Sequence, residues 1–163
     1  MSSNPYAPPK AVVADIRPPL EQAPSLWNPK AAFFWSWVFT PAFGAFLHMV
    51  NWEELGESQK AAAAKIWGIA LVSIMFALAI AGIFVQTINV VSTPLGLVFL
   101  ISWYSSSARE QVRYVKQRFG DDYPRKGWGR PLFLAVMALL GYAAIIATIM
   151  AILSTAGIGV AAN

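Results

Sequence analysis

Two long runs without charge constrain this chain more than any other feature of its sequence. No charged side chain occurs from Ile66 to Val85 or from Leu132 to Leu153. About twenty apolar residues in a helix cross the roughly 30 Å hydrocarbon core of a bilayer, and each run reaches that length. The mean hydropathy of +0.53 and the charged fraction of only 12% are also unusual for a soluble domain. We therefore predict an all-α membrane protein that forms a small polytopic helical bundle.

A third apolar stretch, from Ala31 to Val50, is uncharged but interrupted by Pro41 and Gly44. Proline cannot donate its backbone nitrogen to a helix, and it biases Thr40, the residue before it, away from helical geometry. The stretch is therefore either a Pro/Gly-broken hydrophobic hairpin or a fourth, kinked span. We favour the hairpin, which makes the predicted fold three transmembrane helices plus a re-entrant segment.

Short signals mark the expected ends of the first helices. Asn28 followed by Pro29 predicts a helix start, because asparagine is a good N-cap and proline is tolerated in the first turn. Asn51, placed three residues before Glu54, resembles a capping box and predicts a second start. Ser58 is expected to cap the helix that follows.

The middle of the chain alternates between uncharged and basic segments. Residues 86–94 are polar and end in a proline, so we predict a short turn there, followed by a short span over residues 95–104. Beyond that span, apolar residues spaced three and four apart alternate with cations up to Gly120. This pattern predicts an amphipathic helix that ends at the glycine.

The chain divides into a tail and a membrane domain. Six of the eleven prolines precede Ser25, among small and polar residues. Such a segment cannot bury enough apolar surface to fold. We therefore predict a disordered proline-rich tail over residues 1–26 and a helical transmembrane domain over residues 27–163.

The distribution of positive charge predicts the orientation in the membrane. Residues 107–130 contain seven of the twelve lysines and arginines. Because positively charged loops stay on the cytoplasmic side, this loop is expected in the cytoplasm of a bacterial cell, with the chain in the inner membrane. The hairpin arrangement then places the N-terminus in the cytoplasm and the C-terminus in the periplasm.

Several short blocks of the sequence resemble a family of small bacterial inner-membrane proteins, some of which carry a GYF-like domain at their N-terminus. The blocks are Trp27-Asn28-Pro29, Phe39-Thr40-Pro41-Ala42-Phe43-Gly44, Asn51-Trp52 followed by Leu55-Gly56, and Tyr123-Pro124-Arg125-Lys126-Gly127-Trp128-Gly129. The resemblance covers residues 27 to about 153 and implies no catalytic residues. In this sequence a proline-rich segment precedes the blocks, so nothing attached to the GYF-like domain is carried over.

The sequence offers little material for catalysis. The chain has no cysteine, His48 is its one histidine, and the two long apolar runs contain no Asp, Glu, Lys, Arg or His. Proton relays, buried nucleophiles and metal sites all need such groups at membrane depth. We therefore predict a protein without enzymatic activity, catalytic residues, metal or cofactor.

Two kinds of surface could serve in binding. Small residues recur at every fourth position on two helices, which favours close helix packing, within the chain or against a partner. These residues are Ser73, Ala77 and Ala81 on one helix and Ala143, Ala147 and Ala151 on the other. The basic residues Arg125, Lys126 and Arg130 precede a membrane helix, where cations either set the orientation or bind an anionic lipid.

These features leave three hypotheses for function. The first is a membrane interaction protein that docks on a protein partner or on itself, as an accessory subunit or as an immunity protein against a membrane-acting toxin. The second is a small oligomeric channel or carrier lined by the 31–50 hairpin and the polar 86–94 turn, with flux that depends on Thr40 or Asn89, and the third is an anionic-lipid-binding protein. The lipid bilayer is a partner in all three. Nucleic acid is not an expected partner, because no recognised binding motif accompanies the positive charge.

Overall fold

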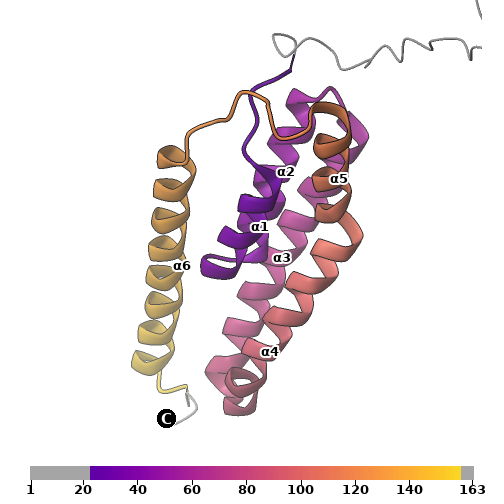
Figure 1. Ribbon diagram of the computed structural model, residues 1–163. Helices are drawn as coiled ribbons and strands as arrows, with labels where there is room; N and C mark the ends of the chain where they lie inside the picture. The colour runs from indigo at the N-terminus through magenta and orange to yellow at the C-terminus, as the bar shows by residue number, and fades with distance from the viewer. Residues whose placement is uncertain (1–22, 159–163) are drawn as a thin grey trace, which may run out of the picture.

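The computed structural model describes residues 23–158, and all of its regular elements are helices. In chain order they are α1 (Pro29–Val38), α2 (Pro41–Glu54), α3 (Ser58–Phe84), α4 (Gln86–Trp103), the π-helical turn η2 (Tyr104–Ala108), α5 (Arg109–Phe119) and α6 (Gly129–Thr155). Figure 1 shows that α1 to α5 pack side by side, whereas α6 runs alongside them at a distance.

Three helices are long and apolar enough to cross a membrane by length and composition. They are α3, α6 and the continuous helix of 34 residues that α4, η2 and α5 form together. The prediction of an all-helical fold with three such helices is therefore confirmed. Most of their side chains are not covered by the rest of the chain. In the most apolar stretch of 18 residues, only 22% of the residues are buried in α3 and only 6% in α6.

The third apolar stretch folds back on itself as a helical hairpin. Helix α1 ends at Val38, and α2 begins at Pro41 after a break at Phe39 and Thr40. The two ends of the hairpin meet, because the backbone N–H of Trp27 donates to Asn51 Oδ1 near the end of α2 at 3.0 Å. A single kinked helix would hold these two residues far apart, so the structure has the hairpin.

The predicted turn over residues 86–94 is wrong. Only Val85 separates α3 from α4, and Pro94 lies inside α4. The side chain of Asn89 donates to the carbonyl oxygen of Gly82 at 3.1 Å and thus caps the end of α3. The polar residues of this segment lie at a tight connection between two helices. The composition of the segment therefore resembles that of a loop.

The predicted helix start at Asn51 is also wrong, because α2 continues through this residue to Glu54. Helix α2 ends instead where Gly56 adopts a φ of 74°, which other residues rarely adopt. The next helix begins at Ser58, but its N-cap is Glu57, whose side chain makes no capping hydrogen bond, so the expected cap at Ser58 is wrong.

The π-helical turn η2 keeps one face of the third long helix against the core. Trp103 and Ala108 are both fully buried. Their positions differ by five, a spacing that would place them on different faces of an α-helix. The wider turn of a π-helix compensates for the extra residue. The amphipathic helix α5 then buries Val115 and ends at Gly120 with a φ of 68°, as predicted.

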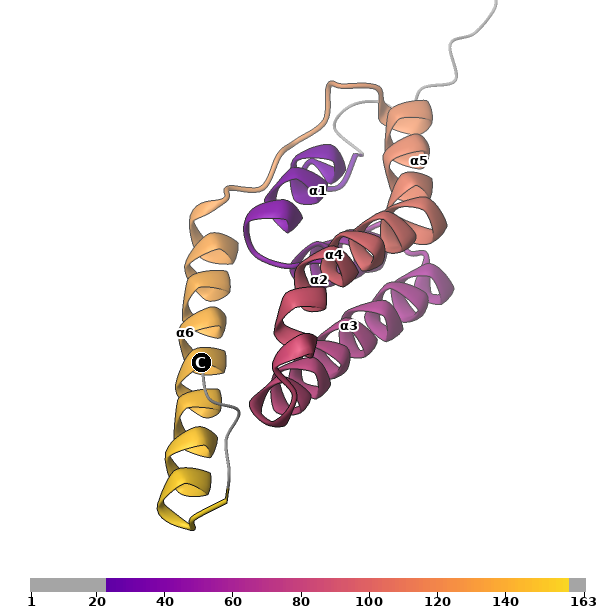
Figure 2. The ribbon, with the colours of Figure 1, turned by 90° about the horizontal axis from the view of Figure 1, so that it is seen from below.

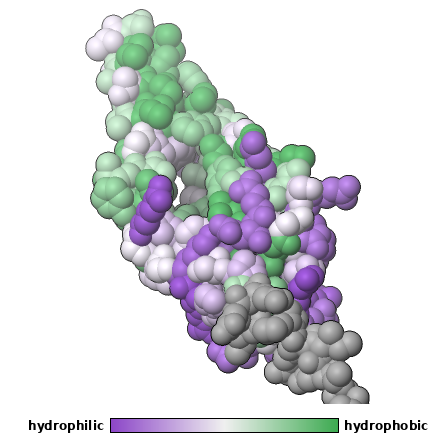
Figure 3. Space-filling model, turned by 90° about the horizontal axis from the view of Figure 1, so that it is seen from above, coloured by the Kyte–Doolittle hydropathy of each residue, from purple (hydrophilic) through white to green (hydrophobic). Residues whose placement is uncertain are grey.

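Two views define the overall shape. Seen from below, α6 stands away from α3 and α4 (Figure 2). Hydrophilic residues gather at the upper end of the molecule as drawn in Figure 1, where α5 and the start of α6 lie. Figure 3 views this polar end from above. The described cations all belong to this polar end, in the first turns of α1 and α6, in α3 up to Lys65, in α5 and in the loop after α5.

Candidate functional site

The break in the hairpin is built by a side-chain cap. Thr40 has extended backbone angles, and its Oγ1 accepts a hydrogen bond from the backbone N–H of Phe43 at 3.3 Å. Pro41 occupies the first turn of α2, where its missing N–H is not needed. The predicted break at Thr40 and Pro41 is therefore confirmed.

Gly44 has a different role from the one predicted, because it lies inside α2 and does not interrupt the helix. A Cβ atom at this position would collide with the side chain of Ser36 in α1 and with the ring of Trp103 in α4. Gly44 therefore lets α1, α2 and α4 approach closely at the centre of the bundle.

A buried polar network holds the base of the hairpin. Asn51 Nδ2 donates to the carbonyl oxygen of Trp27 at 2.8 Å and to Gln111 Oε1 at 3.2 Å. Gln111 Nε2 donates to the carbonyl oxygen of His48 at 2.8 Å, and His48 Nε2 lies 3.3 Å from the carbonyl oxygen of Pro29. These four contacts join the segment before α1 to α2 and α5, and they satisfy polar groups that water cannot reach.

His48 lies in the interior of the hairpin, away from water. Its side chain is fully buried and packs edge-on against the ring of Trp103, with centroids 5.3 Å apart. Its position explains it as a packing group within the hairpin. Within residues 23–158, no group of three or more His, Cys, Asp or Glu side chains comes together that could hold a metal ion.

The loop after α5 is tied to the segment before α1. The backbone N–H of Leu26 donates to the carbonyl oxygen of Pro124, and the backbone N–H of Lys126 donates to that of Leu26, at 3.0 and 2.9 Å. Leu26 is fully buried, in a cluster with Ala23, Val115 and other side chains. The packed part of the chain thus begins before Trp27, where we had placed the domain boundary.

The three cations considered as lipid ligands have different surroundings. Lys126 is 2.8 Å from Glu54 and stacks over the ring of Trp27, so its charge is already paired. Arg125 donates to the backbone carbonyl of Asp121 at 3.0 Å. Arg130 forms no ion pair with the part of the chain that the structure describes.

The two ladders of small residues do not pack against each other. Ser73 and Ala77 on α3 are exposed, and Ala81 is half-buried. The ladder on α6 is exposed at all three of its positions. The rest of the described chain therefore leaves most of these small residues uncovered, and their role in helix packing or partner binding stays a prediction.

Helices α3 and α6 touch through larger side chains. The rings of Phe76 and Tyr142 meet edge to face with centroids 5.0 Å apart, and the Tyr142 hydroxyl lies 3.5 Å from the carbonyl oxygen of Met75. The only buried residues of α6 are Pro131 and Ala135, both near its start. Helix α6 is therefore attached to the bundle at few points.

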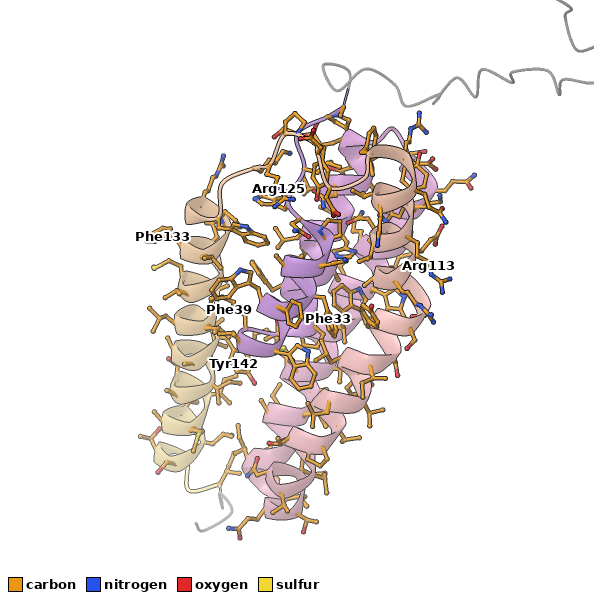
Figure 4. The ribbon with its side chains drawn as sticks, viewed as in Figure 1. Phe33, Phe39, Arg113, Arg125, Phe133 and Tyr142 are labelled. Carbon is orange, nitrogen blue, oxygen red and sulfur yellow. The ribbon has the colours of Figure 1, made fainter. Side chains whose placement is uncertain are left out.

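An apolar groove of about 760 Å³ lies between α6 and the surface of α2 and α3. Figure 4 shows Phe39 and Tyr142 extending into the space between the hairpin and α6, whereas Phe133 points away from it. Arg130, in the first turn of α6, and Trp27 also line this groove. The structure thus brings one of the three predicted cations to an apolar groove and leaves the other two in the loop.

The buried network was missed by the sequence analysis. Gln111 falls on the apolar face of α5 together with Val115 and Phe119, at spacings of four. A polar residue on such a face is a signal for a buried hydrogen bond, because its amide must find a partner there. This signal identifies Gln111 but not Asn51, which nothing in its local sequence distinguishes from a helix cap.

No family model matches this chain, and no curated protein or solved structure gives a significant match. The features of the molecule that bear on function are the locked hairpin, the isolated helix α6 and the apolar groove between them.

Proposed function

We propose that this chain is a non-enzymatic, multi-pass protein of the bacterial inner membrane that docks on a protein partner through α6. The isolation of α6 carries the proposal, since only Pro131 and Ala135 are buried along 27 residues. The ladder of Ala143, Ala147 and Ala151 is small and exposed, so a neighbouring helix can approach the backbone of α6 closely there. In lipid, close backbone approach at small residues is a main source of helix association. The expected partner is therefore a transmembrane helix.

The polar end supports the proposed orientation. Because the described cations lie at one end, the positive-inside rule places that end in the cytoplasm. The hairpin then enters the membrane from the cytoplasmic side and returns, and α6 ends in the periplasm. A cysteine replacing Asp121 should stay unlabelled by an impermeant maleimide in intact cells, while one replacing Ala156 should react. Labelling of Asp121→Cys in intact cells would overturn this topology.

Photo-crosslinking tests the docking surface. A benzophenone amino acid at Ala147 should form a discrete adduct in native membranes, and the same probe at Thr148, which is exposed one residue along α6, should form much less. Ala143→Leu, which blocks close approach, should abolish the adduct. Equal adducts from both positions, or an adduct that survives Ala143→Leu, would contradict docking at the ladder. An adduct of two chains would show self-association in place of a different partner.

Two versions of the partner remain within this proposal. One is a membrane complex that this chain joins as an accessory subunit, and the other is a membrane-acting toxin that it neutralises. The resemblance to small bacterial inner-membrane proteins stays a prediction and favours neither version. Identifying the crosslinked protein by mass spectrometry decides between them.

No observation favours the channel hypothesis enough to propose it. Its two polar candidates serve as helix caps, since Thr40 Oγ1 accepts from the backbone of Phe43 and Asn89 donates to the carbonyl of Gly82. A side chain occupied in this way is a poor ligand for a passing ion or solute. The lipid hypothesis is different, because the groove beside α6 supplies a specific site for it.

A further inference from the structure

The groove beside α6 has an apolar body and a charged rim. Most of its lining is aliphatic or aromatic, contributed by α2, α3 and α6. Examples from the three helices are Phe43, Phe46, Val72, Leu134, Ala138 and Ile145. The cation at its rim is Arg130, in the first turn of α6 at the polar end of the molecule.

We propose that this groove binds one anionic phospholipid, with an acyl chain against the apolar walls and the phosphate on Arg130. The groove opens between helices that are long and apolar enough to cross a membrane, so lipid tails have direct access to it. The guanidinium of Arg130 is exposed and presents a fork of donors that matches phosphate oxygens. Trp27 lines the same groove and adds an indole ring, which favours the headgroup layer.

The lining of the groove argues against a protein helix as its occupant. Its walls are mostly apolar, and its one cation, Arg130, lies at the polar end of the molecule, which matches an acyl chain joined to a phosphate better than it matches a helix. A flexible acyl chain is thinner and adapts to irregular walls. The lipid is therefore the occupant to which the site is suited, and the Ala147 ladder lies on a part of α6 that does not line the groove.

The contacts of the neighbouring cations make Arg130 the headgroup ligand. Lys126 is paired with Glu54, and Arg125 is held by the backbone of Asp121. Neither residue lines the groove. A single cation near the membrane surface favours an anionic lipid by about 1 kcal/mol, which corresponds to a roughly fivefold preference.

Native mass spectrometry tests the headgroup contact. The full chain is extracted from membranes of equimolar phosphatidylglycerol and phosphatidylcholine, and the lipid retained on it is identified. We expect one bound lipid with a roughly fivefold preference for phosphatidylglycerol. Arg130→Gln should abolish the preference while some lipid remains bound, and Arg125→Gln should leave the preference unchanged. Equal loss in both variants would show a diffuse effect of charge and would overturn the assignment to Arg130.

A second pair of variants tests the acyl-chain contact. Ala138→Phe places a ring in the groove and should reduce total lipid retention several-fold, while Ala144→Phe, at an exposed position of α6 that does not line the groove, should not. Leu134→Phe, which also fills the groove, replaces Ala138→Phe if that variant does not fold by circular dichroism. Unchanged retention in the folded groove variant would refute the site. Inorganic phosphate in excess should not displace the lipid, and displacement would identify a simple anion site.

This inference depends on the membrane setting and not on the docking partner. Loss of lipid retention with the Ala147 crosslink intact would leave the docking proposal standing. Loss of the crosslink with lipid retention intact would contradict the docking proposal and leave the lipid site standing. The failure of one proposal can therefore be distinguished from the failure of the other.

Discussion

The part of the chain from α1 to α5 and the single helix α6 are both rich in apolar residues, yet they are held in different ways. In the first part, Gly44 lets three helices approach closely, and Asn51 and Gln111 join the base of the hairpin to α5. Helix α6 is attached mainly by Phe76 against Tyr142 and by the residues near its start. Apolar composition alone therefore does not say which helices belong together.

The difference has a physical reason in a membrane. Lipid tails are as apolar as leucine, so burying apolar surface gives helices no reason to associate. Association needs close packing at small residues or hydrogen bonds between helices. The part from α1 to α5 has both, and α6 has one aromatic pair with a hydroxyl contact of 3.5 Å. The predictions below test this contrast, beginning with the largest effect.

Gly44→Ala should destabilise the protein most, by about 2 kcal/mol or more, because the new methyl group overlaps the Trp103 ring and the Ser36 side chain. The control is Gly141→Ala on α6, where an added Cβ meets nothing within 4 Å. That change should be neutral or stabilising, since alanine is the better helix former. Thermal unfolding in detergent, followed by circular dichroism, measures both. Similar losses in the two variants would remove the contrast between the regions.

Gln111→Leu should cost about 1–2 kcal/mol, because it leaves the carbonyl of His48 without its buried donor and weakens the contacts of Asn51. Gln117→Leu is the matched control, since Gln117 is exposed on the same helix. We expect the control to change stability by less than about 0.5 kcal/mol. The same unfolding experiment applies, and a Gln111→Leu variant as stable as the control would show that the network does not hold the hairpin.

Tyr142→Ala should have the smallest effect on overall stability but should loosen α6. The substitution removes the aromatic pair with Phe76, a contact worth about 0.5–1.5 kcal/mol beyond its buried area. Spin labels at Ile69 and Leu140, introduced as cysteines into a chain that has none, report the separation of α3 and α6. Their distance distribution should broaden in Tyr142→Ala and stay unchanged in Phe133→Ala. A distribution that stays narrow would mean that other contacts hold α6.

Much of the fold follows from local sequence signals. The helix start at Pro29, the break at Thr40-Pro41 and the end at Gly120 were predicted correctly, because a capping side chain, a proline and a glycine act within one turn of the backbone. Two of the wrong predictions, the helix start at Asn51 and the turn over residues 86–94, have a common origin. Asn51 and residues 86–94 carry polar side chains that suit a helix end or a loop equally well.

The candidate site was less predictable, because its parts are far apart in the sequence. Asn51 and Gln111 are 60 residues apart, and Lys126 lies 72 residues from Glu54. The sequence placed Arg125, Lys126 and Arg130 together as one basic group. Only the folded chain shows that Glu54 neutralises Lys126 and that Arg130 alone reaches the groove.

The sequence by itself determined two of the three long apolar helices, the break at Thr40-Pro41 and the gathering of positive charge. Hydropathy, proline geometry and charge are properties of short segments, so they can be read without knowing what the segments touch. The tertiary structure decided the hairpin, the buried network and the isolation of α6. These features depend on which surfaces fit closely against each other and which buried polar groups find partners.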